Sequence, residues 1–270
     1  MTFNYIDIHS HLYFAGFDTD REEEILKLKQ NKIATITVGV DFETSEKAIE
    51  LSQKHENLFA TVGMHPGDLN EQSVFDDRLI ELASHKKVVA IGECGLDYYR
   101  LPPDNLELKT VQKKICQLQI DLALNLDKPL MLHIRPQKGT QDAYDDALDI
   151  LENYKKMREE KLRGNAHFFV GNLDVLKRFF CIGFTVSFGG VITFARDYDD
   201  VIKYAPLNMI MSETDTPFVA PVPFRGKRNS PLYVSEVVKK IAEIRGEDLE
   251  KVRIALRNNG LKYIAQDLLS

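Results

Sequence analysis

The sequence has few cysteines, no long apolar run and no excess of positive charge. Only three of its 270 residues are cysteines, and no two of them form a C-x-x-C pair: Cys94, Cys116 and Cys181. This odd, scattered set argues against a disulfide framework and a thiolate zinc site, and is typical of a reducing compartment. No stretch approaches the roughly 18 apolar residues of a membrane span, so we expect no membrane partner. The start MTFNYIDIHSH lacks the basic and apolar regions of a secretory signal, so we expect a cytoplasmic location.

The charge balance is acidic, with a formal net charge of −6 at pH 7. Any contact with a polyanion must therefore come from a local basic patch. The length is sufficient for one large α/β domain or for two smaller ones. No low-complexity stretch or Gly/Ser linker divides the chain, so we expect a single domain over residues 1–270. Nothing in the sequence specifies an oligomer, and we expect a monomer.

Short β-branched runs alternate with longer amphipathic segments along the chain. Eight strands are predicted, at residues 5–9, 34–40, 58–64, 88–93, 129–134, 165–170, 183–188 and 208–213. A helical pattern follows each strand, one of them an extended helix within the charged segment 137–164, and one or two more helices end the chain. This alternation indicates a parallel sheet, and eight repeats are the count of a (β/α)8 TIM barrel. A doubly wound open sheet is the competing architecture.

Polar residues fall where the predicted strands end, which favours the barrel. Five of the seven histidines lie on predicted strands or just after them, as do three acids: His9, His11, His65, His133, His167, Glu93, Glu213 and Asp215. In a TIM barrel the carboxyl ends of the strands meet at one mouth, where active sites lie. In YIDIHSHL, His9 and His11 are two residues apart on a strand and therefore point the same way. Each histidine alone could be structural, but together with the acids they predict a metal site.

The donors favour two divalent ions. Imidazole and carboxylate suit Zn, Mn, Fe or Ni, and carboxylate-rich sites also accept Mg. Six ligands are expected, more than one catalytic ion takes: His9, His11, Glu93, His133, His167 and Asp215. A carboxylate such as Glu93 can bridge two ions, which together activate a water and stabilise a leaving oxygen. We expect His65 to contact substrate, Asp7 to orient a ligand, and Asp97 to cap the turn after its strand.

A basic loop follows the eighth predicted strand. Arg225-Gly226-Lys227-Arg228-Asn229 places three cations in four residues. Arg225 and Arg228 are therefore candidates for binding substrate phosphate, since a guanidinium can bind phosphate with two hydrogen bonds. The alternative is a solvated basic loop. Tyr98, Tyr99 and Phe218 are candidates to stack on nucleic-acid bases, or else pack loops at the rim.

Taken in order, the motifs resemble the TatD family of metal-dependent hydrolases within the amidohydrolase-like barrels. They cover most of the chain: YIDIHSHL, TVGMHPGD, VVAIGECGLDYYR, KPLMLHIR, NAHFF, VSFGGVITF, SETDTPF and PFRGKRNSPLYV. The resemblance implies a binuclear site of Mg, Mn or Zn. One ion would be held by His9, His11, Glu93 and Asp215, and the other by Glu93, His133 and His167. It also implies that Asp215 is the general base and that the reaction is phosphodiester hydrolysis, including cleavage of DNA.

The chain departs from the family pattern beside two of these residues. Ile134, Arg135 and Pro136 follow His133, and Phe168, Phe169, Val170 and Gly171 stand where the family commonly reads Cys-Phe-Ser-Gly after its histidine. The walls of the site therefore differ, which bears on the substrate. The expected activity is a phosphodiesterase, a deoxyribonuclease acting on single strands or ends. The alternatives are hydrolysis of a carboxylic ester, lactone or amide on the same scaffold, and a non-catalytic metal-binding protein.

Overall fold

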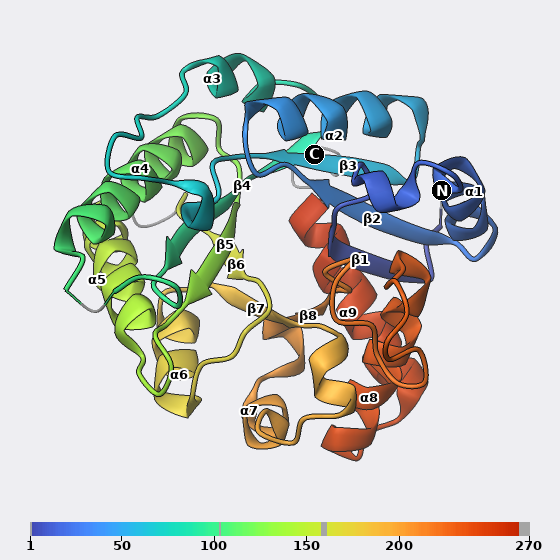
Figure 1. Ribbon diagram of the computed structural model, residues 1–270. Coiled ribbons are helices and arrows are strands. Elements are labelled where there is room, and N and C mark those ends of the chain that lie inside the picture. Colours follow the sequence, from blue (N-terminus) through green and yellow to red (C-terminus); the bar gives the residue numbers. More distant parts are fainter. Residues whose placement is uncertain (1, 103, 158–160, 265–270) are drawn as a thin grey trace.

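The strands form a closed barrel. The computed structural model describes all residues except 1, 103, 158–160 and 265–270 (Figure 1). Its parallel strands lie in sequence order: β1 (Tyr5–Ser10), β2 (Ile33–Val38), β3 (Leu58–Val62), β4 (Val88–Asp97), β5 (Leu130–Arg135), β6 (Gly164–Ala166), β7 (Thr185–Phe188) and β8 (Ile210–Ser212). The first strand meets the segment after the last, where Ser10 pairs with Thr216 and the amide of Asp215 donates to the His9 carbonyl oxygen over 2.9 Å. The predicted (β/α)8 barrel is confirmed, and the open sheet was wrong.

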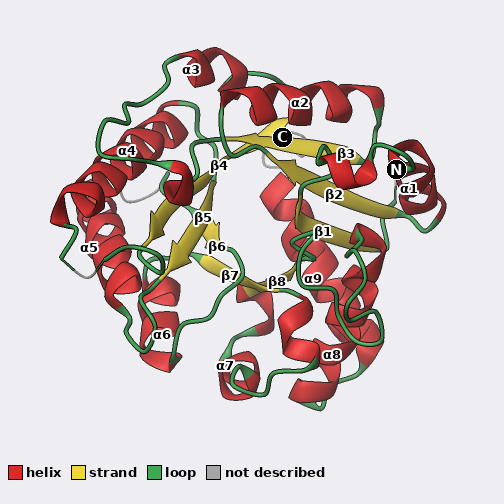
Figure 2. Cartoon of the chain, in the orientation of Figure 1, coloured by secondary structure: helices red, strands yellow, loops and turns green. Residues whose placement is uncertain are grey.

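A ring of helices surrounds the barrel (Figure 2). One helix follows each strand: α1 (Arg21–Gln30), α2 (Phe42–Lys54), α3 (Arg78–Ala83), α4 (Leu106–Asn125), α5 (Asp142–Met157), α6 (Leu173–Cys181), α7 (Asp199–Tyr204) and α8 (Val234–Arg245). The last helix of the described chain, α9 (Leu249–Ile264), has no strand before it. Short 3-10 turns supplement them: η1 (Ala15–Phe17), η2 (Pro66–Asp68), η3 (Gly190–Thr193), η4 (Leu207–Met209) and η5 (Pro231–Tyr233). None of the described helices is long and apolar enough to cross a bilayer.

Helix α6 illustrates why these segments fold onto the sheet. Its Val175, Leu176 and Phe179 recur at helical spacing and are buried. Burying one such side chain stabilises the fold by about 1.5–3 kcal/mol. Asn172 begins the helix, because its side-chain oxygen accepts from the amides of Asp174 and Val175 over 3.0 Å.

Several strands differ in length from the prediction, and for β4 and β6 the backbone gives the reason. β4 continues four residues past Glu93 because glycines let it pass close to β5. A Cβ at Gly92 would lie 2.3 Å from the Met131 carbonyl oxygen, and one at Gly95 would lie 2.1 Å from that of His133. β6 ends early at Ala166, because Phe168 has a φ of 46° and turns the chain out of the extended conformation.

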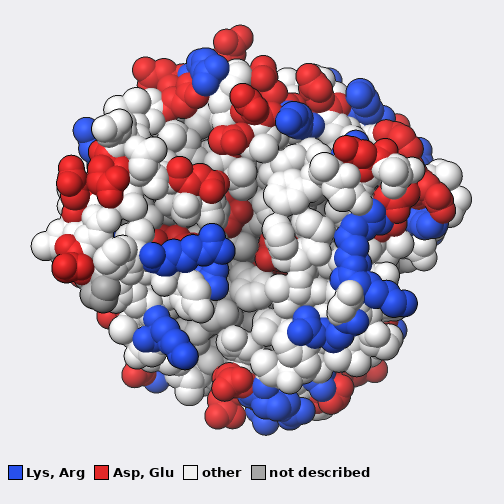
Figure 3. Space-filling view, viewed as in Figure 1, with Lys and Arg blue, Asp and Glu red and all other residues white. Residues whose placement is uncertain are grey.

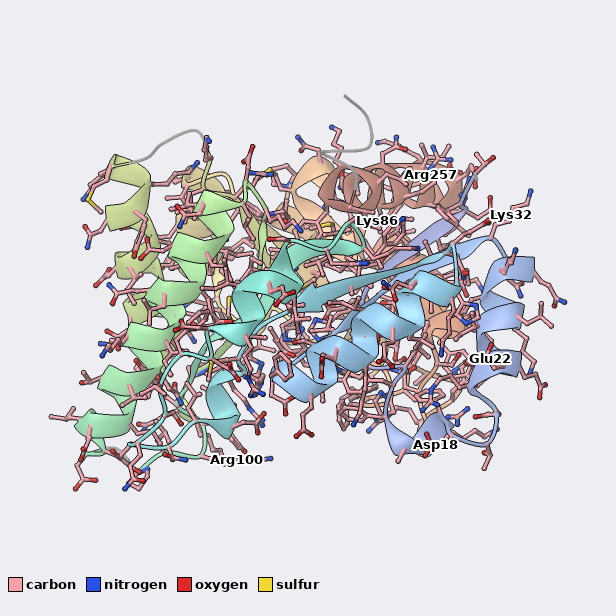
Figure 4. All side chains as sticks on the ribbon, turned by 90° about the horizontal axis from the view of Figure 1, so that it is seen from above. Asp18, Glu22, Lys32, Lys86, Arg100 and Arg257 are labelled. Atoms are coloured by element: carbon pink, nitrogen blue, oxygen red, sulfur yellow. The ribbon has the colours of Figure 1, made fainter. Side chains whose placement is uncertain are left out.

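The two ends of the barrel are built differently. Figure 4 shows Lys32 and Lys86, which precede strands, at the end that α9 covers with Arg257, and Asp18 and Arg100, which follow strands, at the other. We call the first end the floor and the second the mouth; Figure 1 looks into the mouth. The floor contains a buried cluster, packed with α9, that includes Ile6, Ile8, Met131, Met211, Tyr263 and Ile264.

Helix α9 is fixed to the floor by close packing and hydrogen bonds. A Cβ at Gly260 would lie 2.7 Å from Ile6, so glycine permits the helix to approach β1. The Asn259 amide donates to the carbonyl oxygens of Leu207 and Ile210. Since active sites of such barrels lie at the carboxyl ends of the strands, the functional site is expected at the mouth.

Candidate active site

The imidazoles and carboxylates predicted from the sequence meet at the mouth. The Nε2 atoms of His9 and His11 are 3.2 Å apart, and the ring of His9 stacks on that of His167 at 3.9 Å. Within the described chain, three sets of donor atoms lie close enough to hold an ion, each within 4.8 Å: His9, Glu93 and His167; His9, His11 and Asp215; and His65, Glu93 and His133. Residues more than two hundred positions apart thus share one small volume.

Glu93 lies at the centre of this cluster, and its two oxygens face different groups. Oε2 is 3.3 Å from His9 Nε2 and 4.0 Å from His11 Nε2. Oε1 is 2.8 Å from both His133 Nδ1 and His167 Nε2. Such a division is what a carboxylate shared between two cations requires.

Asp215 completes the first group. Its Oδ1 lies 3.8 Å from His9 Nε2 and 3.7 Å from His11 Nε2. Its backbone is left-handed, with a φ of 55°, a conformation that aspartate adopts more readily than most residues. The carboxylate keeps 17% of its surface exposed, so solvent water reaches it.

Three of the imidazoles are oriented by an oxygen on their far side. These contacts are His11 Nδ1 to the Val38 carbonyl at 2.9 Å, His133 Nε2 to Asp97 Oδ2 at 3.1 Å, and His167 Nδ1 to Glu213 Oε1 at 3.4 Å. A neutral imidazole that donates from one nitrogen presents a lone pair on the other. The lone pairs of His133 and His167 then both face Glu93 Oε1, an arrangement that is repulsive without a positive charge between the atoms.

This charge requirement is visible in the pKa values. Burial alone lowers the pKa of His133 and of His167, but the carboxylates around them outweigh it, and both pKa values lie above the usual value. For His133 these are Asp97 and Glu93, and for His167 they are Glu93 and Glu213. A divalent cation would supply the same positive charge to the same nitrogen and oxygen donors, so the residues present fit one.

Glu93 and His9 have the charge states that metal binding needs. Burial alone raises the pKa of the Glu93 carboxyl, yet the imidazoles of His167, His65 and His9 hold it well below its usual range. Burial lowers the pKa of His9 to about 4. Near neutral pH the site therefore offers an ionised carboxylate and a neutral imidazole, the forms that bind metals.

His65 belongs to the cluster by distance but differs in its hydrogen bonding. Its Nε2 lies 3.5 Å from Glu93 Oε1, while its Nδ1 accepts from the Gly67 amide over 3.1 Å. Burial lowers the pKa of His65 to about 4, so the ring is neutral and its one proton is on Nε2. The ring thus presents a donor to the mouth rather than a lone pair, which suits contact with a substrate oxygen.

Asp7 and Asp97 act on neighbours of the cluster. Asp7 is buried and accepts from the amides of His9, over 3.3 Å, and Thr214, over 2.8 Å. It therefore joins β1 to the segment after β8 and positions the backbone of His9 rather than its ring. Asp97 caps the following turn as expected, accepting from the Tyr99 amide over 3.0 Å, and also holds His133.

The aromatic candidates divide into buried and exposed rings. Tyr98 is fully buried and its hydroxyl donates to Asp146 Oδ2 over 2.9 Å, so its predicted role as a stacking platform was wrong. Its alternation with Tyr99 on leaving β4 turns the two rings apart. Tyr99 and Phe218 each keep 47% of their surface exposed, and Phe218 lies edge-on to His11.

The two arginines of the basic loop have different surroundings. Arg228 makes two hydrogen bonds to Asp20, over 2.8 and 2.6 Å, and covers the ring of Phe17. It ties the loop to the start of α1, and its donors are already in use. Arg225 lies 3.8 Å above the Phe194 ring and makes no hydrogen bond or ion pair to any described residue. In the space-filling view, basic side chains flank the central hollow, and acidic ones are visible inside it (Figure 3).

Two positioning residues were not assigned from the sequence. The Glu213 carboxylate accepts from the Phe168 amide over 2.9 Å and from the Ser187 hydroxyl. These two hydrogen bonds hold it beside His167. Its place two residues before Asp215, at a strand end, was the available signal. The contact of Asp97 with His133 depends on the pairing of β4 with β5 and leaves no local trace.

Comparison with known proteins shows the family of this chain. The family model described as TatD related DNase matches residues 6–264. YabD of Bacillus subtilis, an uncharacterised metal-dependent hydrolase, is 38% identical over 252 residues, which cover 91% of this chain and 93% of YabD. YcfH of Escherichia coli K12, also an uncharacterised metal-dependent hydrolase, is 35% identical over 78% of this chain and 75% of its own.

A solved structure carries the same fold. The crystal structure of YjjV, a TatD homologue from Escherichia coli K12, superposes with a TM-score of 0.83 at 29% identity. The match covers 98% of this chain and 99% of that one. The resemblance predicted from the motifs is thereby confirmed: this chain belongs to the TatD family of metal-dependent hydrolases.

Proposed function

We propose that this protein hydrolyses phosphodiester bonds of DNA, at single strands or strand ends, with two divalent cations held at the mouth. The observation that carries the proposal is the division of Glu93, whose two oxygens face separate groups of imidazoles. Two cations bridged in this way suit an in-line displacement at phosphorus. The description of the matching family model, TatD related DNase, supports DNA as the substrate.

The ligands are assigned in two groups. His9, His11 and Asp215 would hold one ion with Glu93 Oε2, and His133 and His167 would hold the other with Glu93 Oε1. The candidate ions are Mg, Mn or Zn, since these donors accept each of them. When bound, they lower the pKa of water and neutralise the charge of the phosphoryl oxygens.

Asp215 and His65 are the residues that would act on water and substrate. The exposed carboxylate of Asp215 would accept the proton of the attacking water. His65 would donate from Nε2 to a phosphate oxygen, as its hydrogen bond from Gly67 favours. The variant His65→Leu should then keep its bound metal and lose kcat/KM, whereas loss of metal would make His65 a ligand.

One assay tests the function as a whole. Purified protein supplied with Mg or Mn is incubated with end-labelled single-stranded DNA, and in parallel with aryl carboxylic esters, lactones and amides. We expect DNA cleavage that disappears on chelation and returns on metal add-back, with about two ions per chain by elemental analysis. Clear ester or amide turnover without DNA cleavage would overturn the proposal in favour of the other hydrolase class.

A further inference from the structure

Three arginines of the described chain have guanidinium groups with no hydrogen bond or ion pair: Arg100, Arg135 and Arg225. Every other described arginine is bonded to a carboxylate, carbonyl or amide oxygen, as Arg228 is to Asp20. All three follow the carboxyl end of a strand or occupy it, and Arg100 is seen at the mouth end in Figure 4. Arginines without a polar partner are thus found at the mouth, although the net charge of the protein is −6.

Of the three, Arg135 shares a strand with one of the expected metal ligands. It ends β5 two residues after His133, so both side chains leave the same face of the strand. In the β4–β5 pairing Gly95 lies opposite His133 and Asp97 opposite Arg135. Two residues of strand span about 6.6 Å, which sets Arg135 outward of the ligand layer.

A ring holds the guanidinium in place. The Cζ atom of Arg135 lies 3.9 Å from the centre of the Tyr99 ring. The Tyr99 amide in turn donates to Asp97, whose other oxygen holds His133. With one face on the ring, the guanidinium keeps its edge donors free, and that planar fork matches the oxygens of a phosphate.

We propose that Arg135, positioned by Tyr99, binds a phosphate that adjoins the scissile one in a single-stranded polynucleotide. The inference rests on the proposed function, because it assumes that a phosphodiester chain enters the mouth. The carboxylates inside the mouth repel such a chain, and an unpaired cation one layer outward offsets this repulsion for the next phosphate. Arg135 at the mouth would thereby favour polynucleotides over substrates with a single phosphodiester.

The test is the steady-state cleavage of a single-stranded octanucleotide by the metal-supplied protein. Arg135→Gln should raise KM about tenfold and leave kcat nearly unchanged, because a hydrogen bond between charged groups is lost in substrate binding. Two further octanucleotides each carry one neutral methylphosphonate, placed in the first on the 5′ side of the cleaved bond and in the second on its 3′ side. At one of these positions the methylphosphonate should raise the KM of the wild type by a similar factor. It should leave the KM of Arg135→Gln unchanged.

Three further variants control for structure. Tyr99→Phe keeps the ring and should match the wild type, while Tyr99→Leu should raise KM about threefold, the size of a lost exposed cation–π contact. Arg78, the first residue of α3, is the matched control, since its guanidinium also lies 3.9 Å over a ring, that of Phe42, but is bonded to Asp76. Arg78→Gln should leave KM unchanged.

The possible results separate the two proposals. DNA cleavage with an unchanged KM in Arg135→Gln, or an equal methylphosphonate penalty in both proteins, would overturn the inference and leave the proposed function intact. A fall in kcat equal to the change in KM would also overturn it, since Arg135 would then support the site itself. Ester turnover without DNA cleavage in the wild type would overturn both.

Discussion

The floor and the mouth are two ends of the same strands, yet they share almost no chemistry. Two segments show this as layers of side chains. On β5 the layers are Met131, His133 and Arg135, and on β8 and the residues after it they are Met211, Glu213 and Asp215. In each case an apolar residue packs into the floor, and the residues two and four positions later carry the charge and the donors. The contrast teaches that the fold needs the first layer and the chemistry needs the next two.

The largest expected effect is at the mouth. Asp215→Asn removes the proton acceptor for the attacking water, and kcat should fall by about 10³-fold. The melting temperature should change little, because the side chain is partly exposed and the asparagine has the same shape. Measuring DNA cleavage and thermal unfolding together checks this. Persistent activity would mean that Asp215 is not the general base.

The matching change at the floor should do the opposite. Met211 is 1% exposed, and Met211→Ala leaves a cavity in the cluster under α9. The free energy of unfolding should fall by about 2–5 kcal/mol, with kcat unchanged at temperatures where the variant is folded. Urea unfolding monitored by circular dichroism gives the stability. A folded variant with strongly reduced kcat would show that the two ends are not separate.

Removal of the cations should lower stability through the mouth alone. Cations bind only the folded site, so an excess of about 100 times the dissociation constant adds roughly 2.7 kcal/mol. Chelation should therefore lower the melting temperature and metal should restore it. In His133→Ala the added metal should raise the melting temperature less than in the wild type. In Arg78→Gln it should raise the melting temperature as much as in the wild type. A metal-independent melting temperature in the wild type would argue against any ion at this site.

The fold could be predicted because the barrel repeats one local pattern. β-branched runs and amphipathic segments alternate eight times, and each predicted strand overlaps an observed one. The boundary errors at β4 and β6 fall where backbone geometry overrides the pattern. β4 runs past Glu93 because of two glycines, and β6 stops at Ala166 because Phe168 is left-handed. Such local conformations depend on neighbours that a single strand's sequence does not contain.

The candidate site could be predicted in its residue types and only partly in its contacts. Strand ends converge in any barrel, so the histidines and acids could be grouped without coordinates. Which nitrogen of His65 carries the proton depends on the Gly67 amide, and the use of Arg228 depends on Asp20, 208 residues away. The burial of Tyr98 likewise follows from α5, through Asp146. The contacts of Arg228 and Tyr98 are tertiary, and none of the three contacts leaves a periodic signal in the sequence.

The smallest expected effect comes from a hydrogen bond at the floor, and it tests directly whether the floor and the mouth are independent. The hydroxyl of Tyr263 donates to the Leu130 carbonyl oxygen over 2.7 Å, joining α9 to the start of β5, the strand that carries His133. Tyr263→Phe should cost about 1 kcal/mol, the net value of one buried hydrogen bond, and lower the melting temperature by about 2 °C. If the floor only supports the barrel, the stabilisation by added cations will be the same in this variant as in the wild type, because independent sites add. A difference above about 0.5 kcal/mol would show that β5 transmits strain from α9 to the ligand layer.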